Sequence, residues 1–221
     1  MKDVAEASQE LGVSPRRVRQ FLEQGVLPGQ RIGGRWIVAD HALEIFGTQE
    51  RSAGRPWSSA AAWAVLAELA ELNLDASPVQ RSRARQRLRD NTLVEVVPQL
   101  RRRAKAMSYY AHPSALERIR LEEPVVLGGV SAAPHVKADL IDPNDHLDAY
   151  IRERDLEGLV RRFALIADAE RPNVVLRVVA TELWPFAPDA RVCPPVVVAL
   201  DLIESADSRS RRAGFDLLQR R

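Results

Sequence analysis

The first fifty residues contain glycine and proline breaks at spacings that allow few arrangements of the chain between them. Apolar residues from Val4 to Leu11 recur at helical intervals, which predicts an amphipathic helix with one buried face. Gly12 follows in the position of a C-cap glycine. Ser14 and Pro15 then supply the N-cap and the first residue of a second helix. Two short helices joined by a tight turn are therefore expected.

The second predicted helix has one apolar and one polar face, and Gly25 is expected to end it. Val18, Phe21 and Leu22 share the face that would pack inward. The opposite face carries Arg16, Arg19, Gln20 and Glu23, with Arg17 at its side. Two helices joined by a glycine-containing turn, with cations and an amide on the second, are the helix-turn-helix pattern. A helical hairpin used for protein contacts is the alternative.

A hairpin and a further short helix follow. Residues 31–38, with the sequence Arg-Ile-Gly-Gly-Arg-Trp-Ile-Val, predict two strands around a Gly-Gly turn. Asp40 is placed to cap a helix over 41–46, whose Leu43 and Phe46 would fold back onto the core. The motifs occur in the order Leu11-Gly12-Val13-Ser14, Gly25-Val26-Leu27-Pro28, Arg31-Ile32-Gly33-Gly34-Arg35-Trp36 and Ala42-Leu43-Glu44-Ile45-Phe46. In this order they resemble the excisionase and MerR-like winged-helix families.

A winged helix of this kind predicts a DNA-binding surface. Arginine suits guanine and glutamine suits adenine in the major groove, so Arg16, Arg17 and Gln20 are expected to reach base edges. Arg31 and Arg35 flank the wing tip and would reach phosphates or the minor groove. The full predicted set is Ser14, Arg16, Arg17, Arg19, Gln20, Arg31 and Arg35. Residues 1–50 hold 6 basic against 7 acidic side chains, so tight binding would need a dimer or cations elsewhere.

A polar stretch with glycine and proline, residues 47–56, marks the expected boundary between two parts of the chain. The sequence predicts a winged helix-turn-helix domain over 1–47, a linker over 48–56, a basic helical segment over 57–107 and an α/β domain over 108–221. Ser58 would cap an alanine-rich helix that ends near Leu72 and packs through Trp57, Trp63, Leu66 and Leu69.

The segment after this helix is the basic part of the chain, with 13 basic against 6 acidic residues over 51–120. Ser77 and Pro78 open a predicted helix whose narrow apolar stripe is Ala84 and Leu88. The basic residues of interest are Arg81, Arg83, Arg85, Arg87, Arg89, Arg101, Arg102, Arg103 and Lys105. They are interpreted either as a solvated helix face, as a second phosphate-contacting surface, or as a dock for an acidic protein.

Helical and strand patterns alternate from residue 108 onward, which predicts a mixed α/β domain with a small sheet. Strands are expected at 109–111, 125–127, 146–151 and 174–180, and helices at 114–120, near 131–137, and at 154–164, 196–204 and 208–220. Asp201 and Glu204 interrupt the apolar pattern of one helix, so that helix is expected to be half buried. The whole chain is thus predicted to be α+β and rich in helix.

Three short motifs lie in this half and the segment before it: Arg55-Pro56-Trp57-Ser58, Val126-Leu127-Gly128-Gly129-Val130-Ser131-Ala132, and residues 197–205, Val-Val-Ala-Leu-Asp-Leu-Ile-Glu-Ser. With these motifs the chain resembles the AbiEi-type antitoxins of type IV toxin–antitoxin systems. The resemblance implies a winged helix that binds inverted repeats in its own promoter. It also implies a C-terminal domain with the antitoxin activity, and a nucleotidyltransferase toxin as partner. The excisionase-like first domain departs from that family.

The glycine pair Gly128-Gly129 suggests an enzymatic alternative, because nucleotidyltransferases combine such a pair with two carboxylates that hold Mg²⁺. The acids that follow, Asp139, Asp142, Asp145 and Asp148, are spaced by three and contain no Asp-x-Asp. We therefore expect no enzyme, with a degenerate, non-catalytic version of that fold as an alternative. His112, His135 and His146 lack ligand spacing and are expected at the surface, so neither metal nor cofactor is predicted.

The remaining composition excludes several classes. The single cysteine, Cys193, excludes an internal disulfide and is expected to be a buried thiol. No apolar run is long enough to span a bilayer, and the first residues lack the apolar core of a signal peptide. The sequence thus predicts a cytoplasmic, sequence-specific DNA-binding repressor that acts as a homodimer. The alternative is a stand-alone transcription factor whose C-terminal domain senses a ligand.

Overall fold

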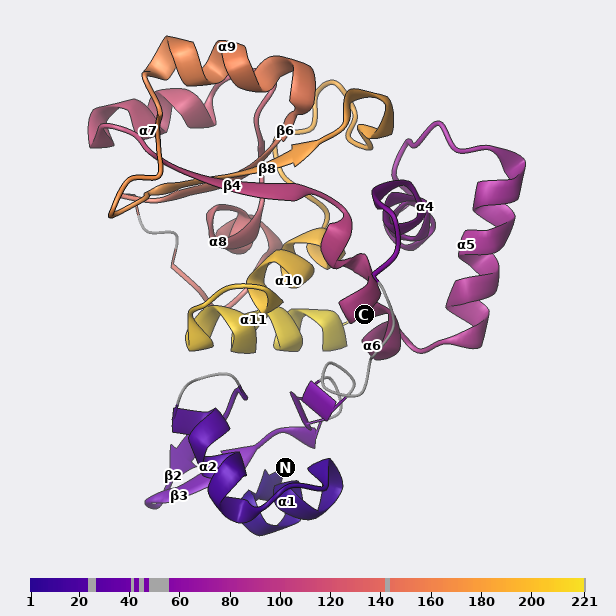
Figure 1. Ribbon diagram of the computed structural model, residues 1–221, viewed down its shortest axis with the longest axis vertical. Helices are drawn as coiled ribbons and strands as arrows, with labels where there is room; N and C mark the ends of the chain where they lie inside the picture. The colour runs from indigo at the N-terminus through magenta and orange to yellow at the C-terminus, as the bar shows by residue number, and fades with distance from the viewer. Residues whose placement is uncertain (24–26, 41, 44–45, 48–55, 142–143, 221) are drawn as a thin grey trace.

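A computed structural model gives the arrangement of the chain and describes residues 1–23, 27–40, 42–43, 46–47, 56–141 and 144–220. Figure 1 shows a small N-terminal module at one end of a larger α/β body, with the C-terminal helix of the body next to the module. The mixed α/β fold with two small sheets confirms the predicted fold class. Among the described helices, none is long and apolar enough to cross a membrane.

The N-terminal module contains α1 (Val4–Leu11), α2 (Pro15–Glu23) and a three-stranded antiparallel sheet. In this sheet β3 (Arg35–Val38) lies between β1 (Lys2–Asp3) and β2 (Gln30–Ile32). Strand β1 was not predicted, because two residues carry no periodicity. Gly12 ends α1 with a left-handed backbone, φ +67°, and the wing turn uses Gly33 and Gly34 at φ +56° and +79°. The predicted helix over 41–46 is described only in part, at residues 42–43 and 46.

A pair of packed helices begins the body. The helix α4 (Ser59–Ala70) is capped by the Ser58 hydroxyl, which accepts a hydrogen bond from the Ala61 backbone. The helix α5 (Pro78–Asp90) packs against it, followed by α6 (Leu93–Val96) and the 3₁₀ helix η1 (Val97–Arg102). Both long helices lie where the sequence predicts them, and Trp63 and Leu66 are fully buried. The expected linker, 48–56, lies outside the described residues except for Pro56.

A five-stranded sheet forms the centre of the body in the order β5-β6-β8-β4-β7. Its strands are β4 (Lys105–Tyr110), β5 (Val126–Leu127), β6 (Leu147–Arg152), β7 (Ile166–Ala167) and β8 (Val174–Val179). Only β6 and β8 are parallel neighbours; the other pairs are antiparallel. Strand β4 begins four residues before the expected 109–111. The sequence did not predict these residues as strand because none of them is β-branched or aromatic.

Helices cover both faces of this sheet (Figure 1). On one face lie α7 (Pro113–Arg120) and α9 (Glu153–Phe163), packed on the alternate residues Leu147, Ala149 and Ile151 of β6. On the other lie α8 (Gly129–Ala132), α10 (Pro195–Ile203) and α11 (Ser208–Gln219). The short 3₁₀ helices η2 (Ala133–Val136) and η3 (Thr181–Leu183) complete the body. The helix expected near 131–137 is thus α8 followed by η2.

The prediction that α10 is half buried is wrong. Every residue from Val196 to Ile203 is buried, including Asp201 at 1% exposure. The helix lies between the sheet and α11, so it has no solvent face. A carboxylate in such a place requires a partner of opposite charge, and the fold supplies two arginines.

Candidate nucleic-acid interface and a buried ionic cluster

The helix α2 presents the side chains that were predicted to read DNA. Val18, Phe21 and Leu22 anchor it to the module core and are at most 5% exposed. Arg16, Arg17, Arg19 and Gln20 are all exposed on the remaining surface. Ser14 serves as the helix cap, since its hydroxyl accepts a hydrogen bond from the Arg17 backbone N–H at 3.3 Å. The exposed second helix of the pair is the element that enters the major groove in helix-turn-helix proteins.

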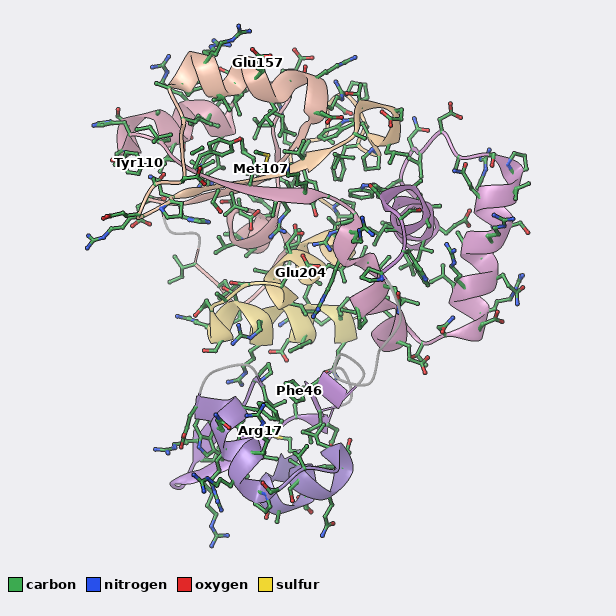
Figure 2. The ribbon with its side chains drawn as sticks, in the orientation of Figure 1. Arg17, Phe46, Met107, Tyr110, Glu157 and Glu204 are labelled. Atoms are coloured by element: carbon green, nitrogen blue, oxygen red, sulfur yellow. The ribbon has the colours of Figure 1, made fainter. Side chains whose placement is uncertain are left out.

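Two of these residues contact one another. An Nη atom of Arg17 donates a hydrogen bond to Gln20 Oε1 at 2.7 Å. The Arg17 guanidinium also lies 4.5 Å from the centre of the Phe21 ring, which in turn packs against Phe46. Figure 2 shows Phe46 on the side of the module that is nearer the body. Arg16 is exposed and makes no ion pair within the described part of the chain.

The other side of α2 meets the wing around a pocket of about 380 Å³. Arg19 contributes from α2, while Arg31 and Arg35 contribute from the two wing strands. Arg31 stacks 5.1 Å from the ring centre of Trp36, which also lines the pocket. The fold thus gathers three predicted cations, distant in sequence, between the second helix and the hairpin. The surface is divided, with Arg16, Arg17 and Gln20 along α2 and the other three cations towards the wing.

The module leaves this surface accessible because it faces the body with a different side. The pocket between them, about 460 Å³, is lined by Pro28, Ile37 and Ala42 of the module and by Phe215 and Gln219 of α11. Figure 1 shows the hairpin β2–β3 at the end of the module that points away from the body. A duplex could therefore approach α2 and the wing without displacing α11.

The predicted second basic surface is present in part. Arg81, Arg83, Arg85 and Arg89 are exposed on α5, Arg101 and Arg102 on η1, and Lys105 on β4. Arg87 is half buried, with its guanidinium 4.5 Å from the centre of the Trp57 ring. Arg103 does not belong to this surface, contrary to the prediction: it is 1% exposed. Because Arg103 follows two exposed arginines in the sequence, the pattern did not indicate that its side chain is buried in the body.

Arg103 is the centre of a buried ionic cluster under the sheet. Its guanidinium donates hydrogen bonds to Asp201 at 2.5 Å and to Glu204 at 2.6 and 2.9 Å. It also donates to the Tyr150 hydroxyl at 3.0 Å and to the Leu100 carbonyl at 3.3 Å. Tyr150 in turn donates to Asp201 at 2.7 Å. Since Arg103 precedes β4, Tyr150 lies on β6 and Asp201 on α10, the cluster joins the sheet to the helix beneath it.

Arg177 of β8 extends the same cluster. It donates two hydrogen bonds to the carboxylate of Asp148, at 3.0 and 3.1 Å, and lies 3.2 Å from Asp201. Burial raises the pKa of Asp148; the Arg177 charge acts in the opposite direction, and the nearby Asp201 charge adds to the rise. The charged members are two arginines against Asp148, Asp201 and Glu204, so the cluster has one formal negative charge in excess when all three acids are ionised.

The glycine pair before α8 is explained by this cluster. The Gly129 backbone N–H donates to Asp201 at 3.1 Å, and the backbone has φ +42°. A Cβ atom at Gly129 would lie 1.9 Å from an Asp148 carboxylate oxygen, and one at Gly128 would lie 2.9 Å from an Asp201 oxygen. Both positions therefore need glycine so that the main chain can approach two buried carboxylates.

The carboxylates are not arranged as a metal site. Both oxygens of Asp148 accept hydrogen bonds from Arg177, and Tyr150 stands two residues on, where an Asp-x-Asp pattern would place the second acid. No group of three or more His, Cys, Asp or Glu side chains that could hold a metal ion occurs among the described residues. His112 and His135 are exposed and His146 is half buried. Cys193 is 2% exposed, as predicted.

A cavity of about 700 Å³ lies beside the cluster, between the sheet and the start of α11. Asp148, Arg177 and Glu204 line one side of it, and His146 and Arg209 line others. Arg177 and Tyr150 are not among the residues predicted from the sequence. A signal existed, because Arg177 is the one charged residue in the apolar strand 174–179. A buried charge there, together with Asp148 on β6 and Asp201 on α10, required pairing.

The comparisons with known proteins concern the N-terminal module. Residues 3–46 match the model of a family described as a helix-turn-helix domain. No curated protein and no solved structure matches the chain. The match covers the two helices and the wing described above, so the predicted helix-turn-helix module is confirmed. The N-terminal module is thus similar to this helix-turn-helix family, and the domain supports DNA binding.

Proposed function

We propose that this protein is a sequence-specific DNA-binding transcriptional repressor that reads its operator through α2 and the wing. The observation that carries the proposal is the accessible face formed by α2 and the hairpin, on a module that matches a helix-turn-helix family. Along α2, Arg16 and Gln20 read base edges. Towards the wing, Arg19, Arg31 and Arg35 contact the phosphate backbone and fix the register.

The module acts as one half of a dimer. Its charge is close to neutral, and a single recognition helix covers only one half-site. Two copies of the chain on inverted repeats double both the contacts and the sequence read. The protein's own promoter is the proposed target, which makes the repressor autoregulatory and places its action in the cytoplasm with the DNA.

The biological role that we infer is that of an antitoxin in a type IV toxin–antitoxin system, with a nucleotidyltransferase toxin as partner. Support comes from the motifs that carry the resemblance, because they build the ionic cluster of the body. The stretch Val126–Ala132 contains Gly129, and the stretch Val197–Ser205 contains Asp201 and Glu204. These motifs therefore preserve an internal framework, and the contact with a toxin lies on the outer surface.

The body is proposed to have no catalytic activity. The supporting observation is that Arg177 occupies both oxygens of Asp148, where nucleotidyl transfer would need a divalent cation. An enzyme of that class would show Mg²⁺-dependent nucleotide turnover lost in Asp148→Asn. The second candidate function is a transcription factor that senses a small ligand. It is favoured by the cavity of about 700 Å³ with Arg177 and Glu204 in its wall.

Fluorescence anisotropy of the purified full chain tests the DNA-binding proposal. The native upstream duplex is compared with a scrambled duplex across a salt titration. Arg16→Ala and Gln20→Ala are expected to cost about 1–3 kcal/mol of discrimination at one base pair each. Arg35→Ala is expected to weaken binding to all sequences alike and to reduce the salt dependence by about one contact. Arg154→Ala, on α9 at the far end of the body, serves as the control.

Two results would contradict the assignment. Equal binding of the wild type to both duplexes would remove sequence specificity from the proposal. Unchanged discrimination in both Arg16→Ala and Gln20→Ala would show that α2 does not enter the groove. Co-purification with the product of a neighbouring nucleotidyltransferase gene separates the antitoxin role from that of a ligand sensor.

A further inference from the structure

We propose that α5 is a second DNA-binding surface, which holds the phosphate backbone without reading sequence. This inference rests on the proposed function, because it assigns to the same duplex a contact outside the helix-turn-helix module. Arg81, Arg85 and Arg89 carry it. They are separated by four residues each and line a shallow groove of about 410 Å³ together with Pro78 and Ser82.

The spacing of these arginines suits a regular polyanion. Residues four apart on an α-helix are separated by about 6 Å along its axis, so the row spans about 12 Å. Each strand of B-DNA carries one phosphate per about 3.4 Å of axis. Because the strand also winds around the axis, a straight row of this length faces up to about three consecutive phosphates of one strand. Guanidinium groups can bind each of them through two parallel hydrogen bonds.

The charge of α5 is not neutralised within the described part of the body. The helix has five arginines and one aspartate, Asp90, which accepts a hydrogen bond from Gln86. Arg85 pairs with Glu68 at 2.8 Å, but its side chain is still 61% exposed. Arg81 makes no ion pair with any described residue. Glu71 and Asp75, on the connection before α5, are exposed and do not cancel the row.

The row of arginines four residues apart also destabilises α5. Like charges at i and i+4 repel each other across one helix face, and α5 buries only Ala84 fully. A capping box compensates at its start, where the Ser77 hydroxyl accepts a hydrogen bond from the Gln80 backbone N–H and Gln80 Oε1 accepts one from the Ser77 backbone N–H. A polyanionic partner relieves the repulsion between the arginines, which a solvated face would leave in place.

The position of α5 fits a contact with the same duplex. It forms one flank of the body, and its C-terminal end is the end nearer the N-terminal module (Figure 1). Nitrogen-tipped side chains project from it on the side away from α4 (Figure 2). The module itself supplies 6 basic against 7 acidic residues over 1–50, so the cations of α5 provide the affinity that the module lacks.

The test is the salt dependence of DNA binding by the triple variant Arg81→Ala, Arg85→Ala, Arg89→Ala in the full chain. Each phosphate contact contributes about 0.9 to the slope of log K against log salt, so the slope falls by about 2.7. Between about 50 and 200 mM salt this difference amounts to about 40-fold in affinity. The matched control is Arg154→Ala, Arg161→Ala, Arg171→Ala, which removes the same charge from α9 and from the connection between β7 and β8. The variant in which the same three arginines are replaced by lysine keeps the charge, so its slope should equal that of the wild type.

The outcomes separate the two proposals because both duplexes, native and scrambled, are titrated. A reduced slope on both, with the native-to-scrambled preference retained and the control variant unchanged, supports α5 as a backbone contact. The proposal is overturned if the triple α5 variant has the same slope as the wild type, or if its slope falls only as much as that of the control variant. An acidic protein would then be the partner to test for α5. Absence of sequence preference in the wild type refutes the proposed function alone, and the slope comparison still decides the role of α5.

Discussion

Replacing Arg103 by methionine is the perturbation that tests the buried cluster most directly. Methionine retains much of the aliphatic stem and removes the charge. The change deletes the hydrogen bonds to Asp201, Glu204 and Tyr150. The backbone carbonyl of residue 103 keeps its bonds from the Trp63 indole at 2.7 Å and the Ser59 hydroxyl at 2.9 Å. The variant therefore isolates the side-chain contribution.

The expected cost follows from what the two acids retain. Removing one partner of a buried ion pair costs about 3–5 kcal/mol because the other charge stays desolvated. Asp201 keeps Tyr150, the Gly129 N–H and Arg177, and the Glu204 side chain is 23% exposed. The loss should therefore be at the lower end, about 3 kcal/mol. With a urea m-value of about 2 kcal/mol/M, the midpoint falls by about 1.5 M.

Urea titration followed by tryptophan fluorescence measures this change, since Trp63 packs against Tyr150 with ring centres 5.9 Å apart. Arg102→Met is the control, because Arg102 is the exposed neighbour in sequence and its replacement should change stability by no more than about 0.5 kcal/mol. A double-mutant cycle with Glu204→Gln should give a coupling energy of about 1 kcal/mol or more. If Arg103→Met differed from Arg102→Met by less than about 0.5 kcal/mol, the cluster would not be holding α10 to the sheet.

Two further predictions concern positions around the same cluster. Gly129→Ala places a methyl group 1.9 Å from Asp148 at φ +42°, so a loss of about 2–4 kcal/mol in unfolding free energy is expected by urea titration. The control Gly158→Ala, in the interior of α9 with open space around its Cβ, should instead stabilise by about 0.5–1 kcal/mol. Burial raises the pKa of the Cys193 thiol, and the charges of Asp201 and Asp148 add to it. Its reaction with a disulfide reagent should be absent in the folded protein at pH 8 and appear in step with unfolding; prompt labelling would contradict the burial.

The parts of this fold that sequence reasoning predicted are those fixed by local chemistry. Gly12 ends α1 and Pro15 begins α2, and Ser58 and Ser77 are the N-caps of α4 and α5 where expected. These signals are interactions between residues a few positions apart, so they can be recognised from the sequence alone. The wing turn at 33–34 belongs to the same class, because consecutive glycines at positive φ suit a tight hairpin.

The parts that sequence reasoning missed depend on contacts between distant residues. Arg103 and Asp201 are 98 positions apart and meet only because α10 packs under the sheet. A run of three arginines was interpreted as one surface, although Arg101 and Arg102 end a 3₁₀ helix and Arg103 is its C-cap. Consecutive residues of a 3₁₀ helix point about 120° apart and do not share a face. Arg177 was overlooked because the strand around it was recognised by its apolar residues. The informative feature was the exception to that pattern, a lone cation in a buried strand.

The arginines of this chain differ in the same way, since some are buried in the body and others are exposed to solvent. Arg103 and Arg177 are desolvated and each contacts two acids at 3.2 Å or less, so their charges are satisfied inside the body. Arg81 and Arg16 are exposed, with no ion pair among the residues that the structure describes, so their charges are available to a polyanion. Composition alone cannot separate these groups. Burial does: it assigns Arg103 and Arg177 to the internal framework, and Arg16 and Arg81 are among the exposed arginines that we propose for the contact with DNA.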